Sequence, residues 1–257
     1  MISVDLNCDM GESFGPWKMG RDSELMDCVS SVNIACGFHA GDASTMRETV
    51  ETAVAKGVAI GAHPGYPDLQ GFGRRNMSLS PQEVFDIVVY QVAAMKGICE
   101  ASGSTLRHVK PHGALYNQAA KDERLARSIA EAVRKIDASL IVFGLSGSLF
   151  ISESEKLGLR TASEAFADRT YQHDGSLTPR TLAGALITNT EMAARQALRM
   201  VKDQTVETVD GGVISFKAET ICIHGDGEYA LEFAREIRNT LLNCNISISA
   251  PRSEFTL

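Results

Sequence analysis

The chain has 257 residues, of which 44% are hydrophobic, and its formal net charge is −7. This length fits one α/β barrel, so we expect a single catalytic domain over residues 1–257. The acidic balance, without a Lys/Arg cluster, argues against a nucleic-acid surface. No apolar run is long enough for a bilayer and the N-terminus lacks a signal-peptide pattern, which predicts a cytoplasmic protein with no membrane contact.

The first strand sets the pattern for the rest of the chain. Side chains alternate along a strand, so Asp5 and Asp9 share one face and Val4, Leu6 and Cys8 share the other. Carboxylates inside and apolar groups outside suit the wall of a barrel. Further strands are expected at residues 31–36, 58–62, 106–110, 140–143, 160–166 and 220–223, with a terminal strand at 246–248. Helices are expected at residues 22–30, 45–56, 81–102, 123–136, 188–201 and 229–242, with a short one ending at Gly158.

Seven strand–helix alternations predict a parallel sheet covered by helices, and right-handed crossovers roll such a sheet toward a barrel. Polar residues follow every strand instead of gathering at one switch point, which favours a seven-stranded parallel β/α barrel. A doubly wound open sheet is the alternative.

Six cysteines lie far apart and form no C-x-x-C pair. Cys8, Cys36 and Cys222 lie within apolar runs, where a free cysteine acts as a small buried hydrophobe. We therefore expect reduced core residues, neither zinc ligands nor nucleophiles.

Four histidines, His39, His63, His112 and His224, each follow the end of a predicted strand. In a parallel barrel these positions meet at the end where active sites form. Any one of them could be a packing residue, but the shared position predicts that at least two line one site. His108 precedes its strand end and is expected to be structural.

Lys110 has the strand parity of His112 and so faces inward with it. It could hold an anionic substrate group or pair with Asp5 or Asp9. These two carboxylates, with Glu12 and Asp226, are candidate bases or metal ligands. Their spacing matches no metal motif such as H-E-x-x-H, so no metal site is predicted, and no P-loop is present.

Four segments carry a resemblance to a known family: VDLNCDMGE at 4–12, NIACGFHAGD at 33–42, GAHPGYPD at 61–68 and VKPHGALY at 109–116. They resemble the LamB/YcsF family. The resemblance implies a barrel like that of polysaccharide deacetylases. It also implies ATP-dependent hydrolysis of 5-oxo-L-proline to L-glutamate by one component of 5-oxoprolinase, together with partner subunits B and C. The implied cofactor is ATP with Mg as its counter-ion.

The roles of individual residues are our hypothesis. Asp5 or Asp9 would be general base to water, one strand-end histidine would carry protons to nitrogen, and Lys110 with another histidine would stabilise charge on oxygen. The catalytic set is then Asp5, Asp9, His39, His63, Lys110, His112, His224 and Asp226. Glu12, Asn33 and Arg74 are expected to bind substrate, with Arg74 on its carboxylate.

Two other functions stay open at the level of sequence. One is a stand-alone metal-dependent deacetylase or amidohydrolase, with Asp9, His39 and His63 as ligands. The other is a barrel that binds a small lactam or sugar without turnover and passes it to a partner.

Overall fold

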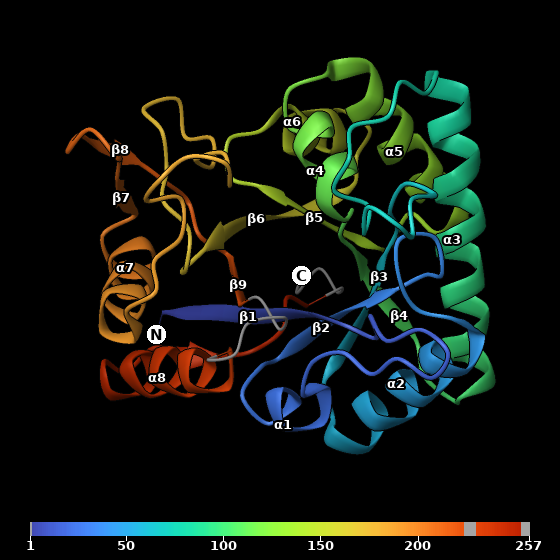
Figure 1. Cartoon of the computed structure of the whole chain (residues 1–257), viewed down its shortest axis with the longest axis horizontal. Coiled ribbons are helices and arrows are strands. Elements are labelled where there is room, and N and C mark those ends of the chain that lie inside the picture. Colours follow the sequence, from blue (N-terminus) through green and yellow to red (C-terminus); the bar gives the residue numbers. More distant parts are fainter. Residues whose placement is uncertain (1, 224–229, 253–257) are drawn as a thin grey trace.

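The computed structural model describes residues 2–223 and 230–252, and its centre is a closed barrel of parallel strands (Figure 1). The barrel strands are β1 (Ser3–Met10), β2 (Ser31–Ala35), β3 (Ala59–His63), β4 (Leu106–Val109), β5 (Ile141–Leu145), β6 (Arg160–Phe166) and β9 (Thr220–Ile223). β1 pairs with β2 on one side and with β9 on the other, which closes the barrel. The predicted seven-stranded barrel is confirmed, and the open sheet is excluded because its two edges pair.

Helices surround the barrel (Figure 1). They are α1 (Asp22–Met26), α2 (Ala43–Lys56), α3 (Pro81–Ala101), α5 (Glu123–Ile136), α6 (Leu149–Lys156), α7 (Thr190–Lys202) and α8 (Ala230–Asn243). The Asp42 side chain caps α2, and Ser80 with Glu83 forms a capping box on α3. α1 is shorter than expected.

Four short elements lie outside the strand–helix alternation. The turn after β4 contains a helix, α4 (Gly113–Ala119), which is not among the helices expected from the sequence. β7 (Thr205–Glu207) and β8 (Val213–Ser215) form an antiparallel pair that the sequence pattern did not predict. The expected terminal strand is present as β10 (Ser247–Ile248), which pairs with β1. The missed elements are too short to show a hydrophobic period.

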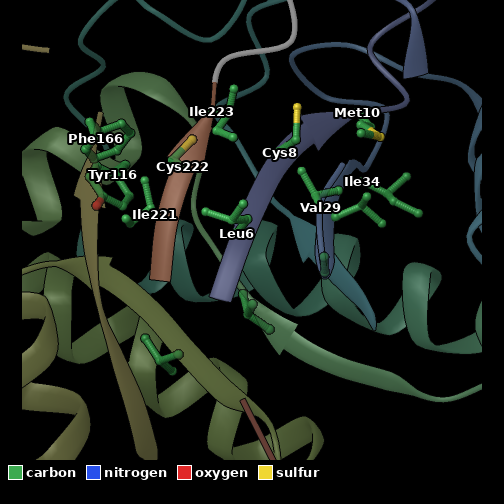
Figure 2. Packing of buried hydrophobic residues seen from close by; sticks show 14 of the residues in the cluster. Leu6, Cys8, Met10, Val29, Ile34, Tyr116, Phe166, Ile221, Cys222 and Ile223 are labelled. Atoms are coloured by element: carbon green, nitrogen blue, oxygen red, sulfur yellow. The ribbon is translucent and has the colours of Figure 1, made fainter. Parts of the chain in front are cut away.

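The main apolar core lies between the barrel and its helices. Figure 2 shows Leu6 and Cys8 on β1 together with Ile221 and Ile223 on β9, and all four are buried. Cys8 is a free thiol, as are the other cysteines, and only Cys244 among them is exposed. The other five cysteines are buried as expected, whereas the expectation of a core residue is wrong for Cys244. The outward face of β1 is the predicted apolar one.

Much of the barrel interior is polar and hydrogen-bonded, beside a small separate apolar cluster of Ile141, Phe143 and Ala162. The Asn7 side chain donates to Glu164 Oε1 at 3.0 Å and to Thr220 Oγ1 at 2.7 Å, and Asn33 donates to Asn7 Oδ1 at 2.7 Å. Buried polar groups are tolerated only when they are paired in this way. The column of polar side chains continues to the carboxyl end of the strands, where the candidate site lies.

Candidate active site

A pocket of about 770 Å³ opens at the carboxyl end of the barrel strands. Asp9 at the end of β1, His63 at the end of β3 and Lys110 just after β4 form part of its wall. The other lining residues include Glu12, Arg74, His112, Tyr116, Phe166 and Arg169. The predicted convergence of strand-end residues is therefore present for Asp9, His63, Lys110 and His112.

Lys110 lies between two carboxylates in the wall of this pocket. Its side chain is 3% exposed, and Nζ lies 2.9 Å from Asp9 Oδ1 and 2.8 Å from Glu164 Oε1. It also donates to Cys222 Sγ at 3.0 Å. Burial acts to lower the pKa of Lys110, but the negative charges of Asp9 and Glu164 outweigh it and raise that pKa well above its ordinary value. Lys110 is a fixed positive charge.

Three imidazole rings lie together beside Lys110. His63 Nε2 is 2.9 Å from His112 Nδ1, and the ring of His39 stacks on that of His112 with centroids 3.7 Å apart. Glu12 Oε1 lies 3.4 Å from His39 Nε2 and 3.7 Å from His112 Nδ1. Burial lowers the pKa of His112 to about 3 and that of His39 well below its ordinary value. Both rings are neutral at physiological pH.

Hydrogen bonds to backbone carbonyls fix the orientation of two of these rings, His63 and His112. His63 Nδ1 donates to the carbonyl of Lys110 at 2.7 Å, and His112 Nε2 donates to the carbonyl of Phe72 at 2.8 Å. Phe72 has a left-handed backbone with φ of 53°, which is uncommon for a residue with a side chain. The amide of Ala114 donates to the carbonyl of Gly73, which attaches the same loop to α4. The loop therefore orients an imidazole.

His39 is packed between two glycines. A Cβ at Gly65 would lie 2.6 Å from His39 Nδ1, and one at Gly73 would lie 2.7 Å from His39 Cβ. These glycines allow the loop backbone to approach the ring closely. His39 is 1% exposed and does not line the pocket, so it contacts the site through His112.

The structure places the other sequence candidates at different depths. Asp5 is not a lining residue; its carboxylate accepts from Ser30, Ser31 and Thr220 at the opposite end of the barrel interior. Burial raises the pKa of Asp5 to about 6 despite these hydrogen bonds.

Asn33 lies below the pocket and donates to Asp9 Oδ1 at 2.8 Å, so it orients a lining carboxylate. Its Oδ1 accepts from His108 Nε2 at 2.7 Å, and His108 also stacks on Phe143, in agreement with the structural role expected for it. Arg74 lines the pocket from the loop after β3. His224 and Asp226 lie outside the described residues.

Two charged residues of the site were missed by the sequence analysis. Glu164 is fully buried on β6 and pairs with Lys110, and Arg169 lines the pocket just after that strand. The available signal was a carboxylate in an otherwise uncharged stretch of strand, which a buried strand tolerates only when the charge is paired.

Comparison with known proteins identifies the family. The model of the LamB/YcsF family matches residues 4–256. The chain belongs to the LamB/YcsF family. A relative from Tolumonas auensis, named as the A subunit of 5-oxoprolinase, is 60% identical over 250 residues, which cover 97% of this chain and 100% of that protein.

Solved structures agree with this LamB/YcsF assignment. The crystal structure of a lactam utilization protein from Thermus thermophilus has a TM-score of 0.93 at 48% identity, covering 97% of this chain and 100% of that one. The catalytic domain of a peptidoglycan N-acetylglucosamine deacetylase from Eubacterium rectale matches at a TM-score of 0.50 and 10% identity, over 98% of this chain and 90% of that one. That likeness concerns the fold alone.

Among the described helices, none has the length and apolarity needed to cross a bilayer.

Proposed function

We propose that this chain is the lactam-opening component of a 5-oxoprolinase that converts 5-oxo-L-proline to L-glutamate. The observation that carries the proposal is 60% identity, over nearly the whole chain, to a relative named as the A subunit of that enzyme. The name of the Thermus structure, a lactam utilization protein, points the same way. A lettered subunit in the name of the relative argues for a multi-subunit enzyme, and we assign the partners as subunits B and C.

A five-membered lactam is an unstrained amide and a poor electrophile, so its hydrolysis needs activation. We assign activation to ATP, with Mg as its counter-ion, and to the partner subunits. Phosphorylation of the amide oxygen makes the ring carbon open to attack by water. The coupled reaction consumes two waters, one at the ring carbon and one at the phosphoryl group.

Within this chain, Asp9 is the general base because it lines the pocket, whereas Asp5 does not. His63 and His112 each use an N–H on a backbone carbonyl. We therefore assign the return of the proton to the departing nitrogen to Asp9 instead of a histidine. Lys110 stabilises negative charge that develops on oxygen. Arg74, with Arg169 beside it in the pocket, binds the substrate carboxylate.

The test is glutamate release from 5-oxoproline by the chain reconstituted with subunits B and C and Mg-ATP. Asp9→Asn should lower the rate by about 10²–10⁴-fold, the usual loss for a general base. Asp137→Asn is the matched control, because Asp137 pairs with Lys96 on the outer helices and is remote from the pocket. Full activity of Asp9→Asn, or no glutamate from the wild-type complex, would contradict the proposal.

A further inference from the structure

Two imidazole nitrogens of the site, one from His63 and one from His112, face each other at hydrogen-bond distance. Carbonyl oxygens only accept hydrogen bonds, so His63 donates from Nδ1 to Lys110 and His112 donates from Nε2 to Phe72. A neutral imidazole carries one N–H. In rings with one N–H each, the remaining nitrogens, His63 Nε2 and His112 Nδ1, both present lone pairs, and they lie 2.9 Å apart.

More acceptors surround this pair. Asp9 Oδ2 lies 3.3 Å from His63 Nε2, and Glu12 Oε1 lies 3.7 Å from His112 Nδ1. Two lone pairs at hydrogen-bond distance repel, and nearby carboxylates add negative charge. A cation among them would turn each of these contacts into an attraction.

His39 provides an independent sign of a ligand. It is 1% exposed, and within residues 2–223 and 230–252 neither of its ring nitrogens makes a hydrogen bond. Its Nε2 points toward Glu12, at 3.4 Å from Oε1. A buried imidazole without a hydrogen bond costs folding free energy unless another species occupies its lone pair.

We propose that Glu12, His39, His63 and His112 bind one divalent transition-metal ion. One donor atom from each residue lies within 4.8 Å of all the others. Four ligands at 2.0–2.1 Å from a tetrahedral ion are about 3.3 Å apart, so the cluster needs only small adjustments. Because His39 and His112 stack in parallel, one of these rings tilts when both reach the ion.

The surroundings resemble those of metal-bound histidines in general. Such histidines donate their second ring N–H to a carbonyl or carboxylate, which fixes the tautomer, and His63 and His112 already do so. Imidazole-rich donor sets select zinc, cobalt or nickel over magnesium or calcium. The ion expected here is therefore a borderline metal such as Zn²⁺, distinct from the magnesium that accompanies ATP.

An ion at this position would lie beside Asp9 and Lys110 in the wall of the pocket. There it would polarise a substrate oxygen or a water molecule, and this role rests on the proposed lactam hydrolysis. Binding of the ion does not rest on it, because the donor atoms are in place whatever the substrate is.

The experiment uses the full chain, stripped with a chelator and then titrated with Zn²⁺ or Co²⁺. We expect one equivalent of bound metal by elemental analysis, intense visible absorption from tetrahedral Co²⁺, and a rise in melting temperature on binding. His39→Asn and Glu12→Gln should weaken binding by about 100-fold or more, since even the loss of an outer hydrogen-bond partner weakens affinity 10–100-fold. His173→Asn, which removes an exposed histidine elsewhere, should bind as the wild type does.

Two results would overturn the proposal. If the wild type binds no stoichiometric metal, the two facing nitrogens share a proton instead. If His39→Asn and Glu12→Gln, shown to be folded by circular dichroism, both bind Co²⁺ with wild-type affinity and absorption, the metal lies elsewhere. Glutamate release with subunits B and C, measured in parallel, separates the two proposals. Metal binding without glutamate removes only the lactam reaction, and glutamate without metal removes only the ion.

Discussion

Asp5 places a carboxylate near the amino end of β1 inside the barrel, where burial raises its pKa to about 6. A carboxyl whose pKa is higher in the folded state than in the unfolded state stabilises the fold when protonated. This contribution is complete below about pH 4 and is lost as the pH rises through about 6. Two pKa units correspond to about 3 kcal/mol.

Asp5→Asn removes this titration and keeps the shape of the side chain. We expect the free energy of unfolding of Asp5→Asn, relative to wild type, to increase by about 3 kcal/mol between pH 4 and pH 7 and to be flat above that. Urea denaturation across this range measures it. A difference that does not change with pH would show that Asp5 titrates normally.

Lys110 neutralises two carboxylates, so its removal should affect stability as well as activity. Lys110→Met leaves Asp9 and Glu164 without their cation, and breaking a buried pair in this way costs about 3–5 kcal/mol. The double variant Lys110→Met/Glu164→Gln should recover part of that stability but none of the glutamate release. Lys96→Met, which removes an outer, partly exposed lysine, is the control. Recovery of activity in the double variant would show that Lys110 acts only as a structural counter-ion.

Much of the site could be predicted at the scale of residues because strand parity and strand ends are visible in the sequence. This is why Asp9, His63, Lys110 and His112 were found. Parity alone cannot tell depth, and Asp5 and Asp9 share a face yet lie at opposite ends of the interior. Glu164 was missed because its partner, Lys110, follows another strand, and only the closed barrel brings them together.

At the scale of elements, replacement of a glycine by alanine should have opposite effects on stability at two positions, Gly61 and Gly97. A Cβ on Gly61 of β3 would lie 2.1 Å from His108 Nε2, and the stacking of His108 on Phe143 leaves that ring little room to move. Gly61→Ala should therefore destabilise the fold by about 1–3 kcal/mol. A Cβ on Gly97 of α3 meets nothing within 4 Å, so Gly97→Ala should stabilise it by about 0.5–1 kcal/mol.

Urea midpoints of the two variants at one pH measure this contrast. If Gly97→Ala instead lowers the midpoint, the added methyl group must clash with a neighbouring part of the protein.

The long helices and strands were predictable from their hydrophobic period and helix caps. α4 and the β7–β8 pair were not, because they are too short to show a hydrophobic period.

At the scale of the whole molecule, closure of the barrel joins the two ends of the chain. β1 has a hydrogen-bonded strand on each side, β2 and β9, whereas β7 and β8 form a separate two-stranded sheet. Amides of β1 should therefore exchange with deuterium only when the whole molecule unfolds, and those of the β7–β8 pair should exchange by local opening.

Hydrogen exchange followed by mass spectrometry tests this order. Equal protection of β1 and the β7–β8 pair would mean that the small sheet unfolds together with the barrel.

The number of strand–helix units in the sequence was enough to predict a closed barrel. The pairing of β1 with β9, which closes it, is visible only in the three-dimensional structure.

The left-handed Phe72 joins two parts of the pocket through one short loop. Its carbonyl fixes the ring of His112, and Arg74 is only two residues further along the same loop. Any displacement of the loop that carries Phe72 therefore breaks its hydrogen bond to His112 and moves Arg74 in the wall of the pocket at the same time. One segment thus links the orientation of an imidazole to the position of a guanidinium that we assign to the substrate carboxylate.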